Sequence, residues 1–189
     1  LLEEGGRRHF MTRRFDRPGP DEKLHMQSLA ALTHLDFMQA GAHSYEQALL
    51  TCTELGLSHR ALEQLFRRMV FNVVARNQDD HVKNIAFLMN RSGRWALAPA
   101  FDVAYSYNPT GDWTSTHQMT IAGKRDDFTL EDLKACAEVA KLQRGAPRRI
   151  LDEVTAVVED WPRFAEEAGV DERRAKEIAR AQRLGIGRV

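Results

Sequence analysis

The most informative part of this chain is Asn77-Gln78-Asp79-Asp80-His81-Val82-Lys83-Asn84, followed by Phe101-Asp102-Val103. Before it, apolar residues recur at spacings of three and four, which predicts a nearly buried helix over residues 58–77. After it, two apolar runs flank a glycine-containing turn, which predicts a β-hairpin over residues 85–98. The polar stretch therefore lies between a buried helix and a hairpin. Asp102 stands at the exit of that hairpin.

The spacing of three polar residues in this region is typical of phosphoryl transfer. Asp79 and Asn84 stand in the D-x-x-x-x-N arrangement of protein kinases, in which Asp orients the acceptor hydroxyl and Asn holds Mg²⁺. Asp102 follows at the point where kinases place a second Mg²⁺-binding Asp. Mg²⁺ prefers oxygen ligands, and a carboxylate kept off the metal can accept the substrate proton. Spacing alone leaves a plain solvated helix end equally open.

Most of the remaining chain is predicted to be helical. A capping box begins at Ser44 for a helix that stops near Gly56, and Thr129 caps another that reaches about Leu142. Pro162 is expected to break or kink a helix. The other predictions are a strand over residues 8–15, helices over 22–33, 147–168 and 171–184, and a loop over 105–120. The fold class is therefore α+β, mainly α with a small β-hairpin.

The composition excludes several classes of protein. The 189 residues suit one domain or one large lobe, and equal numbers of basic and acidic residues, 27 each, argue against a strongly basic nucleic-acid binder. Cys52 and Cys136 are far apart, so we expect free thiols in a reducing cytosol and neither a disulfide framework nor a zinc site. No apolar run approaches the roughly 18 residues that a membrane span requires.

The literal sequence resembles a known family, the HipA-like toxin kinases. Their pattern is D-x-H-x-K-N and then L-x-P-x-[YF]-D-[IV], which residues 79–84 and 97–103 match. Arg14-Phe15-Asp16-Arg17 resembles the R-F-D-R segment at the hinge between the two lobes of these proteins. Gly123-Lys124-Arg125 with Phe128-Thr129 also resembles the stretch that follows the metal-binding Asp. The resemblance covers residues 8 to 133 and implies a protein-kinase-like C-terminal lobe.

This resemblance assigns roles to individual residues. It implies that Asp79 is the catalytic base, that Asn84 and Asp102 bind Mg²⁺, and that Asp80 is a loop residue. The implied ATP site is lined by His81, Val82, Lys83, Asn84, Phe101, Asp102 and Val103, with Arg13, Arg14 and Phe15 meeting adenine at the hinge, largely through backbone groups. Two departures stand out: Arg13 replaces a commonly acidic hinge residue, and Asn77-Gln78 replaces the conventional His-Arg.

A complete kinase also needs a loop over the phosphates and a lysine on an N-lobe strand, and the sequence offers no candidate for either. We therefore expect residues 1–17 to be a residual N-lobe strand and hinge. Residues 18–189 would form the C-terminal lobe, which carries the catalytic loop (77–84) and the metal-binding hairpin (85–104). On this view the chain alone binds ATP weakly and transfers little or no phosphate.

The function that the resemblance implies is a bacterial, cytoplasmic serine/threonine protein kinase, the toxin of a type II toxin–antitoxin system. Its partner would be a small helix-turn-helix antitoxin of the HipB type, through which DNA is mainly contacted, and no membrane is involved. Its substrate would be a protein, and an aminoacyl-tRNA synthetase is the best-known target in the family. Two alternatives stay open: a metal-dependent hydrolase that uses Asp79, Asp80, His81 and Asp102 around a metal-bound water, and a non-catalytic partner-binding module.

Overall fold

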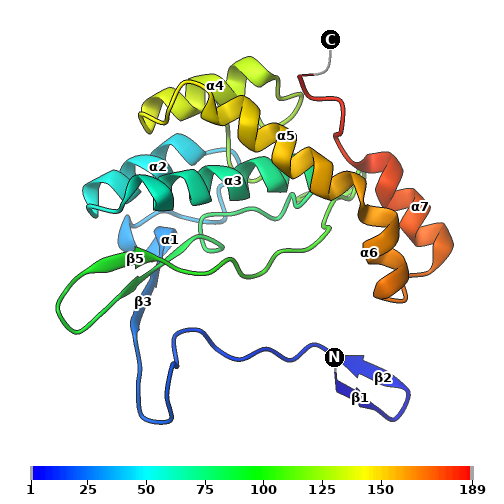
Figure 1. The fold of residues 1–189 in the computed structure, drawn as a ribbon, viewed down its shortest axis with the longest axis horizontal. Coiled ribbons are helices and arrows are strands. Elements are labelled where there is room, and N and C mark those ends of the chain that lie inside the picture. The colour runs from blue at the N-terminus through cyan, green and yellow to red at the C-terminus, as the bar shows by residue number, and fades with distance from the viewer. Residues whose placement is uncertain (1, 188–189) are drawn as a thin grey trace.

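The computed structural model describes residues 2–187 and has the predicted mainly helical α+β class (Figure 1). Within these residues there are seven helices and five short strands, and the strands form two antiparallel sheets. The helices are α1 (Leu29–Leu32), α2 (Tyr45–Glu54), α3 (His59–Ala75), α4 (Leu130–Val139), α5 (Ala146–Glu159), α6 (Trp161–Glu167) and α7 (Glu172–Ala181). The strands are β1 (Leu2–Glu4), β2 (Arg7–His9), β3 (His25–Ser28), β4 (Ala86–Met89) and β5 (Trp95–Leu97).

Helix α3 lies at the centre of the helical layer, between α2 and α5 (Figure 1). Its predicted apolar stripe is confirmed, because all of its residues are buried: Leu62, Leu65, Phe66, Met69, Val70, Val73 and Val74. Burial of a side chain such as Phe66 stabilises the fold by about 2–3 kcal/mol. The helix ends where Arg76 takes a left-handed conformation, with φ 63°, and donates its backbone N–H to the carbonyl of Asn72. This stop directs the chain into Asn77 and the polar stretch.

The predicted hairpin β4–β5 is confirmed, but it belongs to a three-stranded sheet ordered β3-β4-β5. Strand β3 pairs with β4 from His25↔Met89 to Ser28↔Ala86. The prediction of one helix over residues 22–33 is therefore wrong, since only the single turn of α1 is helical there. The physical reason is tertiary, because β4 offers a second edge whose backbone groups need partners.

The predicted strand over residues 8–15 is also wrong in most of its length. Strand β2 ends at His9, because within residues 2–187 it pairs only with β1, joined to it through a turn at Gly5 and Gly6 with φ 56° and 75°. Residues 2–14 are all exposed and form an arm beneath the helical layer (Figure 1). The arm ends in a packed contact, since the Phe15 and Phe101 rings lie 5.9 Å apart.

The other helix predictions agree well with the structure. Capping boxes are present at Ser44 with Gln47 and at Thr129 with Asp132. The 147–168 prediction divides at Asp160 into α5 and α6, with Pro162 in the first turn of α6. Cys52 and Cys136 are buried free thiols, as predicted. Among the described residues, no helix combines the length and apolar character needed to span a bilayer.

Candidate active site

The polar stretch forms a loop that the end of α3 holds firmly. Asn77 is 4% exposed, and Gln78 is fully buried. The backbone N–H of Asn77 donates to the carbonyl of Asn72 at 2.9 Å, and its side-chain amide donates to the Asn72 side chain at 3.0 Å. The last turn of a buried helix therefore fixes the residues that come immediately before Asp79.

Asp80 is the deepest charged group of this loop, with 3% of its surface exposed. Its carboxylate accepts hydrogen bonds from the Tyr45 hydroxyl at 2.7 Å, the Gln118 backbone N–H at 2.8 Å and His117 Nδ1 at 2.8 Å. Burial alone would raise the pKa of Asp80, but His117 and these hydrogen bonds hold that pKa below its ordinary value. Asp80 is thus an ionised anchor between the loop, α2 and the 117–118 segment.

Asp79 differs from its neighbour, because its side chain is 50% exposed. Its backbone N–H donates to Ser106 Oγ at 2.9 Å, which fixes the main chain. The imidazole of His81 faces its carboxylate, with Nε2 3.9 Å from Asp79 Oδ1. Among the described residues no lysine or arginine pairs with Asp79, so its carboxylate is free to accept a proton.

Asn84 and Asp102 line one cavity of about 480 Å³. The side-chain amide of Asn84 donates to the backbone carbonyl of Asp79 at 2.9 Å, which leaves its Oδ1 as the atom able to meet a ligand. Asp102 is exposed, and within residues 2–187 its carboxylate has neither an ion pair nor a hydrogen bond. An amide oxygen and a free carboxylate are the ligand types that Mg²⁺ prefers, so the residues present fit this metal.

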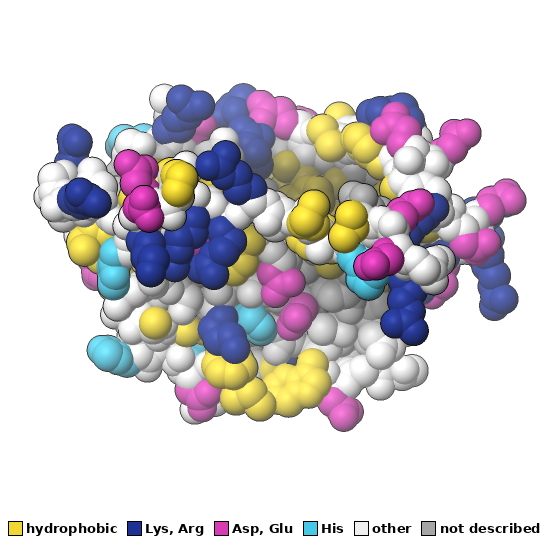
Figure 2. Space-filling view, turned by 90° about the horizontal axis from the view of Figure 1, so that it is seen from below, with side chains coloured by type: hydrophobic (Ala, Val, Ile, Leu, Met, Phe, Trp, Pro, Cys, Tyr) yellow, Lys and Arg dark blue, Asp and Glu magenta, His cyan; other side chains and the backbone are white. Residues whose placement is uncertain are grey.

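The predicted nucleotide-contacting residues divide into two groups. His81, Asn84, Phe101, Asp102 and Val103 lie together on the wall of this cavity. His81 Nδ1 is buried without a hydrogen-bond partner, which suits it to a bound polar group. Figure 2 shows acidic and histidine side chains close together near the middle of the face that the N-terminal arm crosses.

The other predicted residues lie outside the cavity wall. They are Asp79, Val82, Lys83, Arg13, Arg14 and Phe15. The Val82 side chain is 1% exposed and packs in the core, whereas Lys83 Nζ lies 3.5 Å from the centroid of the Phe37 ring. In the arm, Arg14 makes two hydrogen bonds to the Asp16 carboxylate, at 2.9 and 2.7 Å, so its side chain is already engaged.

Sequence reasoning missed the residues that hold Asp80 and the main chain of Asp79. They are Tyr45, Ser106, His117 and Gln118, with Phe37 beneath Lys83. Their hydrogen bonds to the loop span 27 to 38 residues of sequence. The sequence held one signal for such partners, namely the second acid, Asp80, next to Asp79. A charged side chain is either exposed to water or, when buried, paired with specific groups.

The anchoring of Asp80 also bears on the alternative of a metal-dependent hydrolase. That reading needs Asp79, Asp80, His81 and Asp102 around one metal, but three donors already occupy the Asp80 carboxylate. In the described part of the chain, no three His, Cys, Asp or Glu side chains gather as a metal cluster. The geometry thus favours a site with Asn84 and Asp102 as ligands.

Comparison with known proteins gives two findings. The family model described as the HipA-like C-terminal domain matches residues 1–184. The solved structure of HipA from Shewanella oneidensis MR-1, in complex with HipB and its operator DNA, matches with a TM-score of 0.70 and 21% identity over 89% of this chain. The match covers 45% of that HipA chain, so the present chain spans about half its length. No curated protein sequence matches this chain.

Proposed function

Because this chain belongs to the family of HipA-like C-terminal domains, we propose that it is the catalytic lobe of a serine/threonine protein kinase. It would act as the toxin of a type II toxin–antitoxin system and transfer the γ-phosphate of ATP to a protein. The observation that carries this proposal is the shared cavity of Asn84 and Asp102. Asn84 presents a free amide oxygen to this cavity, and Asp102 presents a free carboxylate.

The proposed roles follow from how each group is held. Asp79 is the base, because its carboxylate is half-exposed and its backbone is fixed by Ser106. Asn84 and Asp102 hold Mg²⁺, which neutralises phosphate charge when it is bound. His81, Phe101 and Val103 face the nucleotide from the cavity wall. Lys83 is exposed beside them.

The N-terminal arm and Val82 supply the remaining proposed contacts with the nucleotide. Residues 1–17 would form an N-lobe strand and hinge, with Phe15 against Phe101 and the backbone of Arg13 and Arg14 near adenine. Val82 would contribute through its backbone, since its side chain lies in the core. Because the chain spans about half of the matched HipA, we expect ATP to bind it weakly and phosphate transfer to need the other half.

The proposed partner is a helix-turn-helix antitoxin of the HipB type. The matched HipA structure contains HipB and operator DNA, which supports such a partner for this protein and DNA contact mainly through it. The proposed substrate is a protein serine or threonine, for which an aminoacyl-tRNA synthetase is the family-based candidate.

The decisive experiment is calorimetric titration of this chain with ATP, with and without Mg²⁺. Wild-type chain should bind ATP weakly and only with Mg²⁺, and Asp102→Ala should abolish that binding. Asp112→Ala is the matched control, because Asp112 is an exposed acid of the neighbouring loop. In any longer form of the protein that transfers phosphate, Asp79→Asn should abolish the transfer while ATP still binds. Mg²⁺-dependent binding that survives Asp102→Ala would overturn the proposed metal site.

A further inference from the structure

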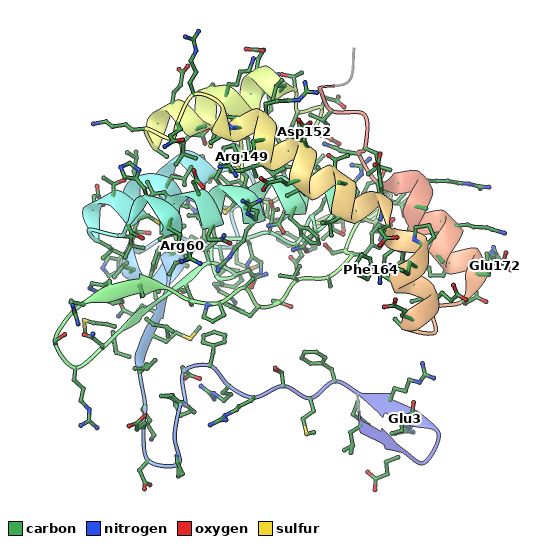
Figure 3. All side chains as sticks on the ribbon, viewed as in Figure 1. Glu3, Arg60, Arg149, Asp152, Phe164 and Glu172 are labelled. Atoms are coloured by element: carbon green, nitrogen blue, oxygen red, sulfur yellow. The ribbon has the colours of Figure 1, made fainter. Side chains whose placement is uncertain are left out.

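A second cavity, of about 690 Å³, lies between the end of α3 and one face of α7. Helix α7 contributes Arg173, Lys176, Glu177 and Arg180, whose spacing of three and four places them on one side of the helix. Arg76 and Tyr107 form the opposite wall. In Figure 3 α7 is the helix that carries the labelled Glu172 at its start, away from the sheet. None of these residues has a role in the proposed phosphate transfer.

The acids of this cavity are already paired. Glu172 pairs with Lys176 at 2.5 Å. Glu177 pairs with Arg174 at 2.8 Å. Among the described residues, the guanidinium groups of Arg173 and Arg180 have no ion-pair partner. The open side of the cavity therefore presents positive charge that no neighbour neutralises.

Arg76 lies on the wall of the cavity opposite α7. Its Nε donates to the Ala181 carbonyl at 2.8 Å, and its guanidinium carbon lies 4.1 Å from the centroid of the Tyr107 ring. These contacts fix the plane of the guanidinium. Its Nη1 is buried without a hydrogen bond, since the nearest carboxylate oxygen, Asp126 Oδ1, lies 3.9 Å away. Nη1 therefore faces Asp126 and not the cavity, and a ligand in the cavity can meet only the 15% of the Arg76 side chain that stays exposed.

Arg183 lies near Arg76 but outside the cavity wall. It pairs with the same Asp126 oxygen, and its own Nη1 is also buried without a partner. Burial and the nearby charge of Arg76 lower the pKa of Arg183 to about 10. Asp126 lies near both guanidinium groups, and Asp127 is a second acid near Arg76, so the excess positive charge of the cavity comes from Arg173 and Arg180 on α7.

We propose that the cavity formed by Arg76, Tyr107, Arg173 and Arg180 binds a phosphate monoester dianion. Guanidinium groups match phosphate oxygens in pairs, and several converging arginines neutralise a dianion better than a single carboxylate. The monoester is carried either by a phosphorylated protein side chain or by a small phosphorylated metabolite. Both sources present the same terminal group to the arginines.

The site is coupled to the catalytic loop by short contacts. The backbone carbonyl of Arg76 accepts from Ser106 N–H at 3.3 Å. Ser106 Oγ in turn accepts from the Asp79 backbone N–H at 2.9 Å and donates to Asn77 Oδ1 at 3.3 Å. An anion that orders Arg76 therefore acts on the same residues that fix Asp79.

The test is titration of this chain with phenyl phosphate and with a phosphothreonine peptide, in EDTA so that no Mg²⁺ bridges the ligand to Asp102. Wild-type chain should bind at least one of the two. Arg180→Gln should weaken that binding about tenfold through loss of a charge-assisted hydrogen bond. Arg173→Gln, on the same helix face, is a second variant, and circular dichroism checks that both fold. Arg94→Gln is the control, because Arg94 is an exposed arginine of the distant β4–β5 turn.

Each outcome decides a point. Tighter binding of the peptide identifies a phosphorylated side chain as the source, and equal or tighter binding of phenyl phosphate identifies a small metabolite. Equal affinity in wild type and both α7 variants, or no binding of either ester at millimolar concentration, overturns the proposal. Because the titration contains no Mg²⁺, its failure leaves the proposed ATP site untouched, and failure of the ATP site leaves this one.

Discussion

The fold holds two segments of the proposed site in opposite ways: the loop of residues 77–84, which we propose to be catalytic, and residues 99–104, which carry Asp102. In the loop, Asn77, Gln78, Asp80 and Val82 are buried and supply its hydrogen bonds or its packing. In the segment, every residue except Phe101 is exposed, and Asp102 has a left-handed backbone with φ 53°. The difference indicates that the proposed base, Asp79, and the proposed amide ligand, Asn84, are fixed in advance, whereas the proposed acidic ligand, Asp102, depends on what binds it.

The largest expected effect comes from removal of the loop anchor. Asp80→Ala should destabilise the chain by about 3–5 kcal/mol, because it leaves buried His117 and Tyr45 without their shared partner. Asp79→Ala is the matched control and should change the free energy of unfolding by less than about 0.5 kcal/mol. Urea unfolding measures both. Equal effects of the two substitutions would contradict the contrast between the buried and the exposed acid.

The pH dependence of stability should also show that Asp80 anchors the loop. The pKa of folded Asp80 lies below its ordinary value of about 3.9. Ionised Asp80 therefore stabilises the fold above about pH 4, and this contribution is lost as the pH falls toward the folded pKa. The difference in free energy of unfolding between wild type and Asp80→Asn should narrow below about pH 4. Asp132, whose pKa is also lowered, is the reference. If Asp132→Asn alone accounts for the acid sensitivity, Asp80 is not the anchor.

The parts of the fold that the sequence predicts are those that depend on neighbouring residues. Helix α3, the β4–β5 hairpin and the D-x-x-x-x-N spacing are local patterns, and each was predicted from neighbouring residues. The capping boxes at Ser44 and Thr129 are equally local. Short-range periodicity therefore located the candidate site between a helix and a hairpin before any tertiary contact was known.

The failures come from long-range contacts. Strand β3 exists because β4 pairs with it across about sixty residues of sequence, and the contacts of Asp80 with Tyr45 and His117 span 35 and 37 residues. No periodic pattern encodes such partners. The strand prediction for the arm fails for the opposite reason. Residues 10–15 have β-tolerant side chains but no neighbouring strand among the described residues to pair with.

A smaller effect is expected where one hydrogen bond of the anchor is removed and its packing is kept. Tyr45→Phe should cost about 1 kcal/mol, because Asp80 and Asn72 each lose a partner at the hydroxyl. Tyr105→Phe is the control, since no hydrogen bond to that hydroxyl occurs among residues 2–187. Thermal unfolding of the two variants makes the comparison. A Tyr45→Phe effect no larger than that of Tyr105→Phe would mean that His117 and Gln118 hold Asp80 unaided.

The smallest expected effect concerns Asp102, in the exposed segment of residues 99–104. A left-handed backbone is unfavourable for residues with a Cβ, and glycine removes that cost. Asp102→Gly should therefore be about 1 kcal/mol more stable than Asp102→Ala, although both lose the carboxylate and should lose Mg²⁺-dependent ATP binding equally. Urea unfolding and calorimetry of this pair separate the backbone from the ligand. If the two variants are equally stable, the left-handed conformation at Asp102 is absent in solution, and this segment is less defined than the loop in backbone as well as in side-chain contacts.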